Sequence, residues 1–121
     1  MSKKKILIID DEEDFCSLLK LNIDEITEYE ALVATSGEAG LDLIQTEKPD
    51  LVLLDIMMPG IDGMETLERI KAAAPDLPVA MLTTVYAEEE ANRCFEAGAY
   101  DYIAKPVDFE YLKTVVLVKL F

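Results

Sequence analysis

The sequence predicts an α/β fold: a doubly wound five-stranded parallel sheet with strand order 2-1-3-4-5, flanked by five helices. Two observations support this prediction. Short apolar runs alternate along the 121 residues with segments of helical periodicity, as βαβ units require. Several runs are apolar throughout rather than at every second residue, which is typical of parallel strands covered on both faces. Right-handed crossovers and the order 2-1-3-4-5, common for a chain of this size, complete the prediction.

Five segments are expected to form the strands. The first, third and fourth, at 6–9, 51–54 and 79–82, read ILII, LVLL and VAML and contain only apolar residues. The second, ALVA at 31–34, is expected at an edge of the sheet, and the fifth, YDYI at 100–103, mixes polar and apolar residues. In this strand order the site of the fold lies outside the carboxyl ends of strands one and three.

Helical spacing and capping signals mark five helices between and after these strands. The residues expected to bound them are Glu13 at the start of the first, Ser36 and Asp62 as N-caps of the second and third, Pro75 and Gly98 as ends of the third and fourth, and Asp108 at the start of the fifth. The apolar residues that mark the helices are Phe15, Leu18, Leu19, Ile26, Leu41, Ile44, Met64, Leu67, Ile70, Ala74, Ala91 and Phe95.

The composition indicates one soluble, cytoplasmic domain that spans residues 1–121. At 51% hydrophobic the chain can bury a sizeable core, but its apolar runs are too short to span a membrane. The apolar run that follows the basic start, MSKKK, stops after Ile9, which is not the pattern of a signal peptide. The net charge of −14 argues against nucleic-acid binding, because contacts to phosphates need clustered lysines and arginines.

The histidine and cysteine content limits the chemistry further. The chain has no histidine, which excludes a Ser-His-Asp triad, a His-ligated zinc site and any phosphohistidine on this chain. Its two cysteines, Cys16 and Cys94, lack metal-ligand spacing. The first and last helices should cover one face of the sheet and the other three the opposite face, which places the cysteines on opposite sides. We therefore expect two buried thiols and no disulfide.

Acidic residues follow two neighbouring strands at the point where each ends. Asp10 and Asp11 follow the first strand, and Asp55 follows the third. Neighbouring parallel strands lie about 4.8 Å apart, so these carboxylates should converge. Two charges at that spacing repel by roughly 3–4 kcal/mol at an effective dielectric constant of about 20. Lys105, at the end of the fifth strand beside Pro106, is the expected fixed cation, and Mg²⁺, which prefers carboxylate, water and phosphate oxygens, is the expected ion.

Taken singly, each of these residues has a simpler interpretation. A lone Asp at a strand end is most often a helix cap or a turn residue, and a Lys before Pro usually lies on the surface. Their joint placement at one edge of one sheet favours a functional site over these alternatives.

Four motifs make the chain similar to a known family over essentially its whole length. They are IIDDEED, LVLLDIMMPGIDGME, PVAMLTT and GAYDYIAKP. With these motifs and the spacings between them, the chain resembles the response-regulator receiver domain, whose doubly wound fold is called CheY-like or flavodoxin-like. The resemblance implies that Asp55 is the phosphoacceptor. The metal ligands that it implies are Asp10, Asp11, Asp55 and the backbone carbonyl of Met57.

The same resemblance assigns roles around the acceptor. It implies that Thr83 is the switch hydroxyl, Tyr102 the switch aromatic and Lys105 the phosphate-binding lysine. Asp55, Thr83 and Lys105 would thus carry the chemistry. Pro59 and Gly60 allow a sharp turn after Asp55, and Gly63 leaves room for the next helix to start close by.

The implied function is that of a signalling domain rather than an enzyme. A receiver of a two-component phosphorelay accepts a phosphoryl group on Asp55 in a Mg²⁺-dependent reaction. The donor would be a phosphohistidine on a partner sensor histidine kinase or histidine phosphotransferase, since this chain has no histidine. The surface of the fourth helix, fifth strand and fifth helix would switch in response. No output domain is expected in this chain, so the protein either stands alone or is part of a longer regulator.

Two further expectations concern apolar residues. Val115, Leu117 and Val118 exceed what one buried helix face can use. Either the last turn frays or Phe121 is an artificial end, or these residues form an interface, which predicts a homodimer or a contact with an output domain through the switching surface. In this family the residues two after the acceptor Asp and two after the switch Thr flank the path of the hydrolytic water. Here they are Met57 and Val85, and neither can hydrogen-bond a water, so we expect a long-lived phosphorylated state.

Three other classes of protein fit the sequence less well. A phosphatase of the haloacid-dehalogenase type needs a second Asp two residues after its nucleophile, where this chain has Met57, and usually a cap domain. A flavin-binding electron carrier needs a phosphate loop rich in Ser, Thr or Gly after strand one, where this chain has DDEED. A degenerate receiver that is only an interaction module would lack one of Asp11, Asp55, Thr83 or Lys105.

Overall fold

The computed structural model describes residues 4–26, 28–58, 60–84 and 87–120, of which 26 and 115–120 are described in their backbone alone. Within these residues five strands alternate with five helices. The elements are β1 (Lys5–Ile9), α1 (Glu13–Ile26), β2 (Glu30–Ala34), α2 (Gly37–Glu47), β3 (Leu51–Asp55), α3 (Gly63–Ala73), β4 (Val79–Thr83), α4 (Glu88–Glu96), β5 (Asp101–Ala104) and α5 (Phe109–Leu120). All neighbouring strands pair in parallel, in the order β2-β1-β3-β4-β5. The predicted fold class is therefore confirmed.

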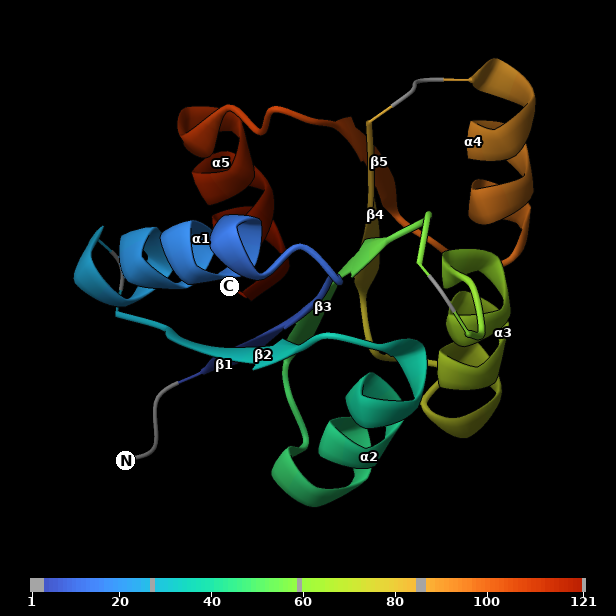
Figure 1. The fold of residues 1–121 in the computed structure, drawn as a ribbon, viewed down its shortest axis with the longest axis horizontal. Helices are drawn as coiled ribbons and strands as arrows, with labels where there is room; N and C mark the ends of the chain where they lie inside the picture. The colour runs from blue at the N-terminus through green and yellow to red at the C-terminus, as the bar shows by residue number, and fades with distance from the viewer. Residues whose placement is uncertain (1–3, 27, 59, 85–86, 121) are drawn as a thin grey trace.

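Helices cover both faces of the sheet. Figure 1 shows α1 and α5 together on one face and α2, α3 and α4 on the other. Two separate clusters of buried side chains fill the space between sheet and helices, one on each face. Every residue of β3 and β4 is buried, whereas β2 lies at an edge and is partly exposed. This agrees with the apolar runs of the central strands and with the expected edge position of the second strand.

The cysteines lie where the layer arrangement places them. Cys16 belongs to the cluster under α1 and α5, and Cys94 to the cluster under α2, α3 and α4. Both are buried and free. Burial, reinforced by the charge of Asp10, raises the pKa of Cys16 to about 11, so this residue stays a thiol and acts as a small hydrophobic side chain.

Local capping chemistry sets the helix boundaries. Ser36 caps α2 by accepting the backbone N–H of Ala39 at 3.1 Å, and Asp62 caps α3 by accepting that of Glu65 at 2.9 Å. These two N-caps were predicted. Gly98 follows α4 with a φ of +109°, the left-handed conformation that terminates helices and that glycine adopts without strain.

Several expectations need correction. The fifth strand begins one residue later than predicted, at Asp101 instead of residue 100. Leu18 and Phe95 mark their helices correctly but are 60% and 44% exposed, and Cys94 takes the buried place in α4. The side chains of Val115, Leu117 and Val118, which were expected to face outward in α5, are not described, and Val85 lies outside the described residues. Within the described part of the chain, no helix is long and apolar enough to cross a membrane.

Candidate functional site

Strand pairing brings the predicted carboxylates together. Ile9 of β1 pairs with Leu54 of β3, so the residues that follow them, Asp10 and Asp55, come side by side at the same sheet edge. One oxygen each of Asp10, Asp11 and Asp55 lies within 4.8 Å of the other two. Asp10 and Asp55 are buried, and Asp11 is exposed. The predicted convergence of these three groups is therefore present.

The loop after β3 is held tightly against the end of that strand. The Gly63 N–H donates to the Ile56 carbonyl at 2.9 Å, and a Cβ at Gly63 would lie 2.3 Å from the Asp55 carbonyl oxygen. Only glycine fits there, since real Cβ atoms do not approach backbone so closely. The Met57 N–H in turn donates to the Asp55 carboxylate at 3.4 Å. The start of α3 thereby holds Asp55 and the loop that follows it in place.

Lys105 is the cation of this pocket. It follows β5, and its backbone N–H donates to the Thr83 carbonyl at 2.6 Å. Its ammonium lies 2.6 Å from Asp10 Oδ2 and 3.8 Å from Asp55 Oδ1. It also pairs with Glu12 at 3.0 Å and lies 4.4 Å from the centre of the Phe15 ring, within the range of a cation–π contact.

The charges in the pocket are not balanced by Lys105 alone. Burial, and next the charge of Asp10, raises the pKa of Asp55 to about 6, although Lys105 and the Met57 N–H act in the opposite direction. Burial lowers the pKa of the Lys105 ammonium, but its hydrogen bonds to Asp10 and Glu12 outweigh this effect, and the pKa is raised. Among the residues that the structure describes, the pocket therefore holds one fixed cation beside several carboxylates. This donor set suits a hard divalent cation such as Mg²⁺.

Thr83 lies on β4, beside the strand that carries Asp55, and Tyr102 lies one strand further on, in β5. Asp55 pairs with Leu82 in β4, and the next residue, Thr83, pairs with Ala104 in β5. Thr83 is 1% and Tyr102 6% exposed. The Tyr102 hydroxyl donates to Glu90 Oε1 at 3.2 Å.

The Tyr102 hydroxyl thus sits in a polar environment inside the fold. Burial raises its pKa, and a side-chain hydrogen bond with Thr83 opposes that rise. Tyr102 therefore connects Thr83 with Glu90 in α4.

Sequence reasoning missed two acidic partners in this region. Glu12 was visible within the motif IIDDEED, but a run of acids does not reveal which carboxylate reaches a distant lysine. Glu90 lies in a run of three glutamates at the start of α4, and its contact with Tyr102 depends on how the helix is rotated over the sheet. Neither contact has a sequence signal of its own.

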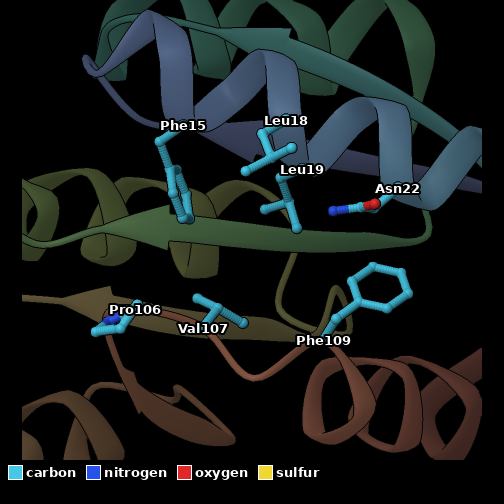
Figure 2. Close-up of a pocket in the computed structure, with 7 residues that line it drawn as sticks. All are labelled: Phe15, Leu18, Leu19, Asn22, Pro106, Val107 and Phe109. Carbon is cyan, nitrogen blue, oxygen red and sulfur yellow. The ribbon is translucent and has the colours of Figure 1, made fainter.

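An apolar groove adjoins the site. Figure 2 shows side chains of α1 facing those of the segment between β5 and α5 and of Phe109, the first residue of α5. The cavity between them has a volume of about 150 Å³. Its lining residues are Phe15, Leu18, Leu19, Asn22, Pro106, Val107 and Phe109. Since Phe15 contacts the Lys105 ammonium, the groove begins directly beside the charged pocket.

The fold and the site define a CheY-like α/β domain with an acidic pocket at the carboxyl ends of its strands. The chain belongs to the response regulator receiver domain family, whose pattern it matches over residues 6–117. It is 40% identical over 103 residues to the alkaline phosphatase synthesis transcriptional regulatory protein PhoP of Bacillus subtilis, and this match covers 85% of the chain but 42% of the relative. The chain thus spans less than half the length of that relative.

Solved structures agree with this assignment. A CheY-like receiver domain protein from Methanospirillum hungatei superimposes with a TM-score of 0.92 at 33% identity, covering 98% of this chain and 94% of that one. The BeF3-activated N-terminal receiver domain of Klebsiella pneumoniae RstA superimposes with a TM-score of 0.90 at 30% identity, covering 97% of this chain and 98% of that one.

Proposed function

We propose that this chain is a phosphoacceptor receiver domain of a two-component phosphorelay, with Asp55 as the acceptor. The observation that carries the proposal is the meeting of Asp10, Asp11 and Asp55 at one sheet edge beside Lys105. Family membership supports it, because receiver domains act as signalling domains that interact with histidine kinases or phosphotransfer proteins. The donor is then a phosphohistidine on such a partner.

The residues of the pocket suit phosphoryl transfer. An oxygen of Asp55 attacks phosphorus, the bond to the histidine nitrogen breaks, and the phosphoryl group passes to the carboxylate. Lys105, whose ammonium already lies near Asp55, stabilises the negative charge on the phosphoryl oxygens. Asp10, Asp11, Asp55 and the Met57 carbonyl would hold Mg²⁺. When bound, the ion supplies neutralisation of the same charge.

Thr83 and Tyr102 form the proposed switch. A phosphoryl group on Asp55 offers new acceptors to the Thr83 hydroxyl, and movement of Thr83 alters its hydrogen bond with Tyr102. Because the Tyr102 hydroxyl also donates to Glu90, the change reaches α4. The proposed output surface consists of α4, β5 and α5.

The remaining parts of the proposal concern the setting of the domain. We propose that residues 1–121 form one receiver domain that acts in the cytoplasm. Its output surface would contact a second copy or an output domain, and sedimentation of the phosphorylated chain with and without Val115→Lys and Val118→Glu tests this contact. A parent that stays monomeric at high concentration would remove the homodimer.

Acetyl phosphate with Mg²⁺ tests the acceptor chemistry. We expect a mass increase of one phosphoryl group, mapped to Asp55 after borohydride trapping and digestion. A phosphatase would release phosphate continuously, and a flavin carrier would stay inert. A receiver that acts only as an interaction module would fold and stay unlabelled, and that result would refute the proposed function.

The side chain at position 57 is expected to control the lifetime of the phosphorylated state. Met57 is 67% exposed and cannot hydrogen-bond a water, so it does not assist hydrolysis of the phosphoaspartate. We expect the double variant Met57→Asn/Val85→Glu to lose its label several-fold faster than the parent, and Met57→Leu to match the parent. Decay is measured after removal of acetyl phosphate. Equal decay of the double variant and the parent would contradict this expectation.

A further inference from the structure

The Lys105 ammonium is engaged more closely by other carboxylates than by the acceptor. It lies 2.6 Å from Asp10 and 3.0 Å from Glu12, but 3.8 Å from Asp55. A nitrogen–oxygen distance of 3.8 Å is too long for a hydrogen bond. In this structure, the ammonium that would bind the phosphoryl group is therefore held to one side of Asp55.

The backbone of Glu12 is fixed at both of its polar groups. Its N–H donates to Asp10 Oδ1 at 2.9 Å, and its carbonyl accepts the Cys16 N–H at 3.0 Å, in the first hydrogen-bonded turn of α1. The Glu12 side chain thus starts from a rigid position beside the pocket. The side chain itself is 57% exposed, so its pairing with Lys105 is screened by water and can dissociate at small cost.

A second contact, from Phe15 in α1, acts on the same ammonium. The Phe15 ring lies 4.4 Å from it, and Phe15 is half-buried in the wall of the groove in Figure 2. Glu12 and Phe15 together hold Lys105 toward the start of α1, whereas Asp55 lies on β3. Glu12 is the member of this pair that carries a charge and can compete with a phosphoryl group.

We propose that Glu12 is a positioning residue that holds the Lys105 ammonium away from Asp55 until a phosphoryl group arrives. This inference rests on the proposed function, since it concerns the same acceptor. A phosphoryl group carries about two negative charges and three acceptor oxygens, against the single charge of Glu12. Lys105 leaves Glu12 for the phosphoryl oxygens, and breaking this pair opposes phosphorylation of Asp55.

The matched pair of variants Glu12→Gln and Glu13→Gln tests the proposal. Both remove one negative charge from neighbouring exposed residues, but only Glu12 contacts Lys105. The readouts are the affinity for beryllofluoride, which mimics a phosphoryl group on a carboxylate, and the half-saturating concentration and maximal rate for acetyl phosphate. We expect Glu12→Gln to bind beryllofluoride about two- to fivefold more tightly than Glu13→Gln, the size expected of a partly exposed ion pair.

A double-mutant cycle separates positioning from a general structural effect. In a Lys105→Ala background, Glu12→Gln and Glu13→Gln should have equal affinities for beryllofluoride, because the ammonium that Glu12 restrains is gone. Equal affinities in the parent background, or a difference that persists without Lys105, would overturn the inference while leaving Asp55 as the acceptor. Failure of the parent chain to bind beryllofluoride or take up phosphate would instead remove the proposed function, and this inference with it.

Discussion

Asp55→Asn should abolish stable phosphorylation and, in the absence of divalent cations, stabilise the protein at neutral pH. The amide has nearly the shape of the carboxylate, so the substitution removes both the proposed nucleophile and a buried charge while it changes the packing little. Asp55 is 3% exposed and lies beside the buried Asp10. If the carboxylate serves as the proposed nucleophile, its unfavourable burial is a trade between stability and function that is common at active sites.

The sign of the stability change follows from the pKa of Asp55. Burial and the charge of Asp10 raise this pKa to about 6, from 3.8 in an exposed carboxyl. The folded state therefore binds the proton more tightly than the unfolded state does. The resulting stabilisation is fully present below about pH 4 and is lost as the pH rises through about 6. At pH 7 and above the loss is on the order of 3 kcal/mol at most.

Denaturant unfolding in EDTA as a function of pH measures this effect. The free energies of unfolding of the parent and Asp55→Asn should be similar near pH 4 and should diverge by about 1–3 kcal/mol by pH 7.5, with the variant more stable. Asp11→Asn, which removes an exposed charge from the same pocket, should have a smaller effect. If the parent is as stable as Asp55→Asn at pH 7.5, or more stable, the pKa of the Asp55 carboxyl is not raised by burial.

Magnesium should reduce the difference in stability between the parent and Asp55→Asn. A ligand that binds only the folded state stabilises it by about 1.4 kcal/mol at a tenfold excess over its Kd. We expect the melting temperature of the parent to rise with millimolar Mg²⁺ and that of Asp55→Asn and Asp11→Asn to rise much less. A parent insensitive to millimolar Mg²⁺ would argue against a metal site at these carboxylates.

The parts of the site that the sequence predicts best are those set by topology. Once the strand order is known, the ends of β1 and β3 must meet, so the convergence of Asp10 and Asp55 follows from two apolar runs that each precede an Asp. The N-caps Ser36 and Asp62 are predictable for a different reason. Their hydrogen bonds join residues three apart, so local chemistry decides them.

The parts that escape prediction depend on side-chain conformation and on helix rotation. Glu12 pairs with Lys105, which lies 93 positions away in the sequence. Spacing alone does not distinguish Glu12 from the neighbouring acids of the same motif as the partner of Lys105. Leu18 and Phe95 fit helical periodicity, yet they face outward because α1 and α4 are rotated to bury Leu19 and Cys94. The rotation of a helix over the sheet is set by packing across the whole face of the sheet, and no short motif encodes that packing.

Gly63→Ala is expected to destabilise the protein by about 2–4 kcal/mol, through a clash of the new methyl group with backbone. Its Cβ would lie 2.3 Å from the Asp55 carbonyl oxygen and 2.5 Å from Ile56 Cα. Helix propensity alone predicts the opposite sign, because alanine is the better helix former by up to about 1 kcal/mol. The sign of the measured change therefore decides between local propensity and the close approach of α3 to the acceptor strand.

Gly60→Ala is the matched control for this prediction. Gly60 lies in the same loop with a φ of +79°, and a Cβ there would meet only the flexible end of Glu38, at 3.4 Å. Its substitution should cost about 1–2 kcal/mol from the left-handed backbone alone. Gly63→Ala should unfold at a lower denaturant concentration than Gly60→Ala and should take up phosphate from acetyl phosphate more slowly, because the backbone displaced by the methyl group carries Asp55. If Gly63→Ala is as stable as Gly60→Ala or more so, the start of α3 does not hold the acceptor loop in the way that these contacts indicate.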